Sequence, residues 1–192
     1  MKTFLIIGGV LAVLFLLNAG CAAVRGGYAS APYKVVRADG KFEVREYPEL
    51  VLVETPMHGA NNGFMRLFHY IDGQNAAHQK LAMTTPVFMA RGASNGTMAF
   101  VLPPGVSSAS APSPAGTDVR VREQAGGRFA VLRFSGGISP AHEAKALARL
   151  QSWLGQAKLT AVGDPIYGYF DPPWTPPCFR RNEVMLRLVA VP

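Results

Sequence analysis

Four histidines and two cysteines are the strongest potential metal ligands in this chain of 192 residues. His69 is of most interest, because it adjoins large apolar residues at helical spacing and a neutral imidazole there could coordinate a metal. A solvated surface histidine is the alternative. His58 and His78 fall in expected loops and His142 in the first turn of an expected helix, and no pair has zinc spacing with further ligands.

Soft and aromatic side chains surround His69 in the sequence. Phe64, Met65 and Phe68 precede it, and Met83, Met89 and Met98 follow. Methionine gives polarisable surface that suits a flat aromatic ligand, and it fills irregular gaps in a core equally well. The pattern therefore predicts either a ligand-binding face or ordinary core packing.

Signatures of catalysis are absent from the sequence. There is no Gly-x-Ser-x-Gly elbow, phosphate loop or dinucleotide fingerprint. The 12 acidic residues are scattered, so paired acid–base work cannot be argued. The net charge of +7 is spread without a basic block, which favours anionic ligands or acidic lipids over nucleic acid. We expect a binding protein, not an enzyme.

Residues 1–20 have the pattern of a secretory signal peptide. Lys2 precedes the apolar run Phe4–Leu17, which is shorter than the roughly 20 residues of a membrane-spanning helix. Small residues before Cys21 resemble a bacterial lipobox, although Asn18 stands where leucine is preferred. We predict acylation of Cys21; cleavage near Ala23 and an uncleaved anchor are the alternatives.

Three segments follow from this pattern: a signal peptide over residues 1–20, a flexible tether over 21–32 and one domain over 33–192. Ala22 lacks the acidic character that retains lipoproteins at the inner membrane. We therefore expect a monomeric, periplasm-facing lipoprotein, at the outer rather than the inner membrane.

Alternating patterns predict antiparallel strands, and two amphipathic stretches predict helices. The expected strands cover 33–37, 41–47, 50–53, 84–90, 97–102, 119–123, 129–134, 165–170 and 183–191. Asn61-Asn62 caps a helix over about 63–72, whose apolar stripe is Phe64, Leu67, Phe68 and Ile71. Ser139-Pro140 opens a second helix, whose buried stripe is Ala144, Leu147, Ala148, Trp153 and Leu154.

The order of elements repeats, since each half gives two strands, one helix and two strands. We align GKFEVREY of the first half with GRFAVLRF of the second. The sequence thus predicts an α+β fold with a pseudo-two-fold repeat. Its eight-stranded antiparallel sheet would be curled or would form a distorted barrel.

Five segments, in order, resemble the SOUL family of haem-binding proteins. They are GKFEVREYPELVLVET, GFMRLFHYIDGQN, KLAMTTPVFM, FVLPPG and GYFDPPWTPPCFRRNEV. The resemblance spans about Tyr33 to Leu188, and Phe170 is an extra residue between Tyr and Asp of the last motif. It implies a βαββ repeat and also a likeness to effector-binding modules of some transcription regulators.

The resemblance further implies non-covalent haem binding in an apolar groove along the first helix. On this chain the groove residues would be Phe64, Met65, Leu67, Phe68, His69, Leu81 and Met83. His69 is the candidate ligand of the haem iron, although the family has no uniform axial ligand. Arg66 and Lys80 could meet the propionates or be solvated surface charges.

The C-terminal motif has a structural interpretation. We expect Arg180 or Arg181 to pair with Glu43 or Glu46 and fix the last strand, and Cys178 to be a buried thiol. The resulting functional hypothesis is a haem- or tetrapyrrole-binding protein of the bacterial cell envelope, acting in storage, transfer or buffering. The alternative is an effector-sensing or protein-interaction module that binds another amphipathic molecule.

Overall fold

The computed structural model describes residues 27–57, 63–91 and 96–189. The strands are β1 (Ala29–Ser30), β2 (Lys34–Asp39), β3 (Phe42–Tyr47), β4 (Leu50–Met57), β5 (Thr84–Thr85), β6 (Val87–Ala90), β7 (Gly96–Val101), β8 (Arg120–Gln124), β9 (Gly127–Phe134), β10 (Ala161–Tyr169) and β11 (Asn182–Leu188). The helices are α2 (Gly63–Ile71), α3 (Pro140–Ala157) and the short 3-10 helix η1 (Pro177–Phe179). Both predicted helices are confirmed, and the predicted strand over 84–90 is divided at Pro86.

Nine of these strands form one sheet in the order β2-β3-β9-β11-β10-β6-β7-β4-β8. The eight strands after β2 are arranged symmetrically about the middle of the sheet. Each strand of the first half lies as far from one end of this row as its counterpart in the second half lies from the other end. The corresponding pairs are β3 and β8, β4 and β9, β6 and β10, and β7 and β11. The predicted pseudo-two-fold α+β fold is therefore confirmed. The sheet has nine strands and not the predicted eight, because the strand expected over 33–37, which is β2, joins it at one edge.

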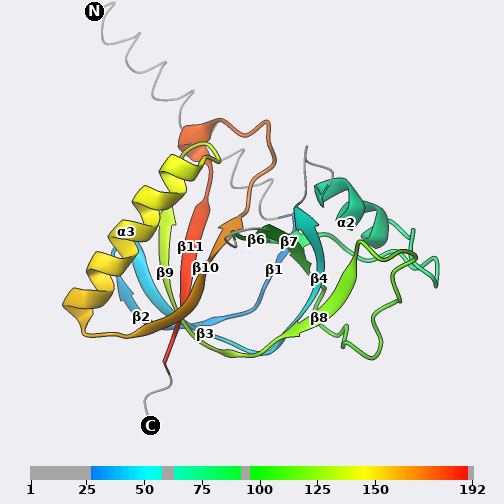
Figure 1. Ribbon diagram of the computed structural model, residues 1–192, viewed down its shortest axis with the longest axis horizontal. Helices are drawn as coiled ribbons and strands as arrows, with labels where there is room; N and C mark the ends of the chain where they lie inside the picture. Colours follow the sequence, from blue (N-terminus) through cyan, green and yellow to red (C-terminus); the bar gives the residue numbers. More distant parts are fainter. Residues whose placement is uncertain (1–26, 58–62, 92–95, 190–192) are drawn as a thin grey trace, which may run out of the picture.

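The sheet curls without closing, as Figure 1 shows. Its two edges, β2 and β8, do not pair with each other in the ranges given above. A curled open sheet is thus the correct alternative of the two predicted, and the distorted barrel is not.

The alignment of the two halves was wrong. By position in the sheet, β9 corresponds to β4 and β3 corresponds to β8. The two segments that we aligned are instead neighbours, with Phe42 opposite Leu132 and Arg45 opposite Phe129. Neighbouring strands of a sheet bury side chains on the same face, and so do strands related by internal symmetry. Both relationships therefore give similar alternation of apolar and polar residues.

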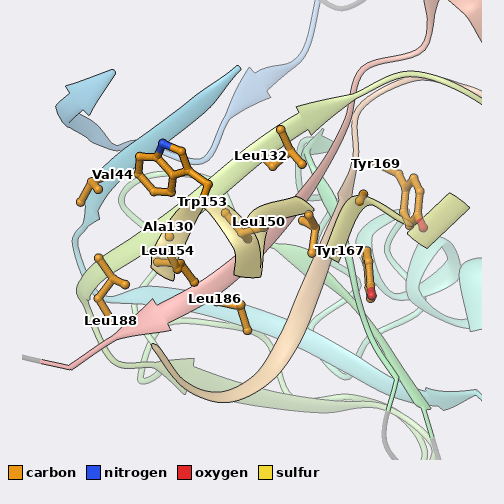
Figure 2. Packing of buried hydrophobic residues seen from close by; sticks show 12 residues of the cluster. Val44, Ala130, Leu132, Leu150, Trp153, Leu154, Tyr167, Tyr169, Leu186 and Leu188 are labelled. Atoms are coloured by element: carbon orange, nitrogen blue, oxygen red, sulfur yellow. The ribbon is translucent and has the colours of Figure 1, made fainter. Parts of the chain in front are cut away.

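Helix α3 covers one part of the outer face of the sheet. Ser139 caps it by accepting a hydrogen bond from the His142 backbone N–H, as predicted. Leu150, Trp153 and Leu154 pack against strand residues, as Figure 2 shows. The predicted stripe was partly out of phase, because Ala144 and Ala148 are exposed. The buried positions are Glu143, Ala146, Leu150, Trp153 and Leu154.

The inner face of the sheet is covered by the start of the described chain. Strand β1 pairs in parallel with β5, and the buried Ala31 joins a cluster with Leu52, Val131 and Met185. The ring of Tyr33 packs against Tyr47, with 5.3 Å between centroids. The end of the segment predicted as a tether therefore packs on the domain.

No helix in the described ranges is long and apolar enough to cross a membrane. The predicted signal peptide and Cys21 lie outside those ranges, as do His58 and the expected cap at Asn61-Asn62. These interpretations stay predictions.

Candidate functional site

Helix α2 is held on the sheet by one narrow face. Leu67, Tyr70 and Ile71 are buried in a cluster with Val53 and Phe100 of two adjacent strands. The Tyr70 hydroxyl donates a hydrogen bond of 2.7 Å to the Pro112 carbonyl. The helix is therefore fixed in rotation about its axis, and its opposite face is fixed with it.

That opposite face is apolar and open. Phe64, Met65 and Phe68 are 41%, 46% and 39% exposed. With about 100° between successive residues, the order around the helix is Phe64, Phe68, Met65, His69, within an arc of roughly 140°. We call these four residues the open face of α2.

The open face is ordered by ring contacts. The Phe64 and Phe68 rings stack with 6.3 Å between centroids and 12° between planes. Phe64 also meets the ring of Phe100 at 5.2 Å and 64°. Two near-parallel rings that are about 40% exposed provide apolar surface of the kind a planar ligand can cover.

Two interpretations of Phe64 and Phe68 were left open, a ligand-binding face and core packing beside Leu67 and Ile71. Core packing was wrong, because both residues are exposed and Tyr70 is buried instead. The phenol can be buried because its hydroxyl has the Pro112 carbonyl as acceptor. Hydrophobicity alone ranks phenylalanine above tyrosine for burial and so rotated the predicted face.

The other predicted groove residues lie under the helix or near its end. Leu67 is fully buried, and Leu81 and Met83 are part buried against the α2 cluster. The Leu81 backbone N–H donates to the carbonyl oxygen of Ile71 at 2.8 Å. Of the seven predicted residues, the structure thus brings Phe64, Met65, Phe68 and His69 together at the surface.

The two cationic side chains near the open face, Arg66 and Lys80, differ in how firmly they are held. Arg66 donates to Thr55 Oγ1 at 2.9 Å and to the Pro56 carbonyl at 2.6 Å, so its guanidinium is fixed to β4. Lys80 is 76% exposed and contacts Asp72 at 2.9 Å. Exposed pairs of this kind are weak, so Lys80 can leave Asp72 for another anion at little cost.

The remaining histidines do not assemble a metal site. His78 is exposed, and the Nδ1 atom of His142 lies 3.0 Å from the Gly137 carbonyl. No group of three or more histidine, cysteine, aspartate or glutamate side chains suited to a metal ion occurs within the described residues. The His69 ring is exposed and has no hydrogen-bond partner there, so the nitrogen lone pair of the neutral ring is free to bind a metal ion.

Sequence reasoning missed a buried network of charged side chains, which joins β3 to β11. The Arg45 guanidinium is fully buried and bonds both carboxylate oxygens of Glu183, at 2.6 and 2.9 Å, and Glu43 at 2.6 Å. Arg181 and Arg133 reach the same two carboxylates from the rim. The alternation in KFEVREY already placed Glu43 and Arg45 on one face, which was the available signal.

The predicted pairing of the C-terminal arginines was therefore wrong. Arg181, just before β11, bonds Glu183 of that strand at 2.7 Å, and Arg180 donates to the carbonyls of Thr175 and Pro173. Glu43 takes Arg45 and Arg133 instead. Arg45 lies between the carboxylates of Glu43 and Glu183 and so takes the place expected for Arg180 or Arg181.

The network changes the ionisation of its members. Burial alone would raise the pKa of Glu183, but the hydrogen bonds and charges of Arg45 and Arg181 outweigh it and hold that pKa below its usual value. Burial also raises the pKa of Tyr47 to about 12. Near neutral pH, Glu183 is therefore ionised and the Tyr47 phenol keeps its proton.

Cys178 is exposed, so the prediction of a buried thiol was wrong. It lies on η1, none of whose residues is buried, within a corner made rigid by prolines. The sequence signal was the rarity of free cysteine at surfaces, and the proline-rich turn overrides it.

A palindromic sheet with one helix in each half defines a class of α+β domains. The chain is similar to a crystal structure of the EcmrR C-terminal domain, with a TM-score of 0.58 and 10% identity over 83% of this chain and 99% of that one. It is similar to a crystal structure of a hydrolase from Listeria innocua, with a TM-score of 0.58 and 12% identity over 80% of this chain and 94% of that one. At such identities the likeness shows the fold alone.

The family model of the SOUL haem-binding proteins matches residues 28–187. The chain therefore belongs to the SOUL haem-binding family, as its motifs indicated, and membership supports non-covalent haem binding. No curated protein matches the chain.

Proposed function

We propose that this protein binds haem or a related tetrapyrrole non-covalently on the open face of α2. The observation that carries the proposal is the exposed, stacked pair Phe64 and Phe68 beside Met65 and His69. A haem macrocycle needs a flat apolar surface, and its iron can accept an imidazole nitrogen. Family membership supports haem as the ligand.

The position of Lys80 also supports haem binding on the open face of α2. Haem propionates are anionic, and Lys80 is the freer of the two cations near α2. With its charge held mainly by an exposed pair, Lys80 could meet one propionate while the ring covers the two phenylalanines. Such an open site would exchange its ligand more readily than a closed pocket, which suits storage, transfer or buffering.

We place the protein in the bacterial cell envelope as a lipoprotein anchored through Cys21, facing the periplasm and at the outer membrane. Ala29 is paired with Thr84 in β1 and β5, and it lies eight positions after Cys21. An extended chain of that length spans at most about 29 Å. Since Met83 adjoins Thr84 and packs near α2, the anchor would hold the open face close to the lipid.

A haem titration of the full chain in detergent, followed by absorbance, tests the proposal. Wild type should give a saturable shift of the Soret band with fixed stoichiometry. Phe68→Ser should weaken binding about tenfold, since it removes one of the two stacked rings. The matched control is Val162→Ser, which changes an exposed apolar residue of β10 and should bind as wild type does. A non-saturating response equal in all three samples and in empty micelles would contradict the proposal.

The axial role of His69 has its own test. His69→Ala should change the spectrum of bound haem more than its affinity, because the apolar contacts remain while one iron ligand is lost. His142→Ala is the control, since that ring lies at the start of α3. An identical spectrum for wild type and His69→Ala would remove His69 as a ligand.

Mass spectrometry of the ligand that copurifies from native membranes separates this proposal from the effector-sensing or protein-interaction alternative. A tetrapyrrole supports haem binding. A different amphipathic molecule on the same face would make haem affinity incidental.

A further inference from the structure

A hollow lies away from α2, and none of its lining residues comes from that helix. Its volume is about 370 Å³, at the lower end of the range for small-molecule sites. Its walls come from the β2–β3 turn, the end of β9 and the proline-rich corner around η1. The lining residues are Gly40, Lys41, Arg133, Phe134, Ser135, Cys178, Phe179, Arg180 and Arg181.

The lining is strongly basic. Four of the nine residues are cationic and none is acidic. Beneath them, Arg45 and the carboxylates of Glu43 and Glu183 complete the buried network. Counting Asp171, whose carboxylate accepts the Arg181 backbone N–H, five cations face three carboxylates. The hollow thus has a surplus of two positive charges.

The surplus is located on particular side chains. Lys41 and Arg180 form no ion pair with a carboxylate of the described residues, although Arg180 bonds two carbonyl oxygens. Arg133 is 41% exposed, although its Nε atom is buried 3.4 Å from Glu183 and its Nη2 atom contacts Glu43 at 3.0 Å. Lys41 and Arg180 can therefore donate to an anion without breaking an ion pair, and Arg133 adds a third positive charge beside them.

The walls are held in place before any ligand arrives. The Gly136 backbone N–H donates to the Pro177 carbonyl at 3.0 Å, and Asn182 Nδ2 donates to the Gly136 carbonyl at 3.0 Å. These two bonds tie η1 to the ends of β9 and β11. Because the corner between Asp171 and Cys178 holds four prolines, little chain entropy remains to be lost on binding.

We propose that this basic hollow binds a phosphate monoester, with the phosphate against Lys41, Arg133 and Arg180. Such a group carries nearly two negative charges at neutral pH, which matches the surplus of the hollow. Guanidinium groups bind phosphate oxygens in paired hydrogen bonds. Phe134 and Phe179 offer apolar walls to the organic part of the ligand. The ligand is a free phosphorylated molecule or the headgroup of a lipid with a terminal phosphate.

Calorimetric titration of the full chain in detergent tests the proposal. Phenyl phosphate should bind with saturation and more tightly than benzoate, which carries one charge. Binding should also slow alkylation of the Cys178 thiol, which lines the hollow. Short-chain phosphatidic acid, with the same phosphate monoester, identifies the source: binding at least tenfold tighter than phenyl phosphate assigns a lipid, and weaker or equal binding assigns a free ligand.

Charge reversal at the rim tests the residues. Lys41→Glu should weaken phenyl phosphate binding about tenfold, because it adds a negative charge where the structure places a free cation. Lys145→Glu, on the exposed side of α3, is the matched control and should bind as wild type does. Arg180→Gln should weaken binding as well, and a folding failure of that variant leaves the Lys41 result standing.

The proposal is overturned if phenyl phosphate binds no better than benzoate, or if Lys41→Glu and Lys145→Glu bind alike. Haem titration of Lys41→Glu should match wild type, since the hollow contains no residue of α2. Failure of phosphate binding and failure of haem binding are therefore distinguishable.

Discussion

The two halves of this protein share one topology and use their helices differently. Helix α3 has 18 residues and α2 has 9. None of the large apolar side chains exposed in the described chain lies on α3, whereas Phe64, Met65 and Phe68 of α2 are among them. One half has therefore used its helix to complete a core, and the other presents apolar surface to solvent. The proposed haem site accordingly lies in the half with the short helix.

The two halves also differ in how deeply they bury their ion pairs. Arg45 of β3 is fully buried between two carboxylates. At the related position, Arg120 and Arg122 of β8 pair with Glu54 while 70% and 35% exposed. Equivalent strands thus hold one ion cluster inside the fold and one at its surface, which predicts different costs of removal.

The largest effect should come from Arg45→Met. The substitution leaves Glu43 and Glu183 buried without their main partner, which costs about 3–5 kcal/mol. Urea unfolding measures the free energy. Arg120→Gln is the control in the other half and should cost below about 1 kcal/mol, since the Arg120 side chain is 70% exposed and Arg122 still pairs with Glu54. Equal losses in both variants would abolish the distinction between the two clusters.

The buried faces of the two helices should respond alike. Leu150→Ala in α3 and Leu67→Ala in α2 each remove a side chain that is fully buried, and each should cost about 2–5 kcal/mol. Urea unfolding again gives the values. A loss below 1 kcal/mol for Leu67→Ala alone would show that α2 is loosely held and that its open face is not fixed.

Acid should weaken the fold through the buried network. Because folding lowers the pKa of Glu183 below 4.5, its contribution is complete well above pH 4.5 and is lost as the pH falls through the lowered value. Each unit of lowering corresponds to about 1.4 kcal/mol. Urea midpoints measured from pH 7 to pH 3 should fall below pH 4.5.

Glu183→Gln removes that titrating group and is the test of its contribution. The variant should be less stable at pH 7 and should lose less on acidification than wild type. The surface cluster adds a parallel contribution, since its two arginines also lower the pKa of Glu54 against the opposing effect of burial. An acid response unchanged in Glu183→Gln would move the effect to that cluster or elsewhere.

The smallest effect on stability should come from the open face itself. Phe68→Ser should change the free energy of unfolding by less than about 1 kcal/mol, because the ring is 39% exposed and the helix is held from the other side. The same variant should lose haem affinity. If it unfolds instead, Phe68 belongs to the core and the contrast between the halves is lost.

Much of the fold was accessible from the sequence. Alternation, turn residues and the cap at Ser139 predicted both helices and the strands of the main sheet, and the ordered motifs predicted the family. These signals are local, since each depends on residues within one element or its ends. The site was predicted in part, because helical spacing gathered Phe64, Met65, Phe68 and His69 near each other whichever face was buried.

The rest depended on contacts between distant residues. The sequence by itself determined the elements, the internal repeat and the cluster of apolar side chains around His69. Only the tertiary structure decided that β3 crosses to pair with β9, that Tyr70 takes the buried place of Phe68, and that Arg45 joins Glu183 across 138 positions of the chain. Which face of an element is buried is a property of what packs against it, and that partner is set by the fold rather than by local spacing.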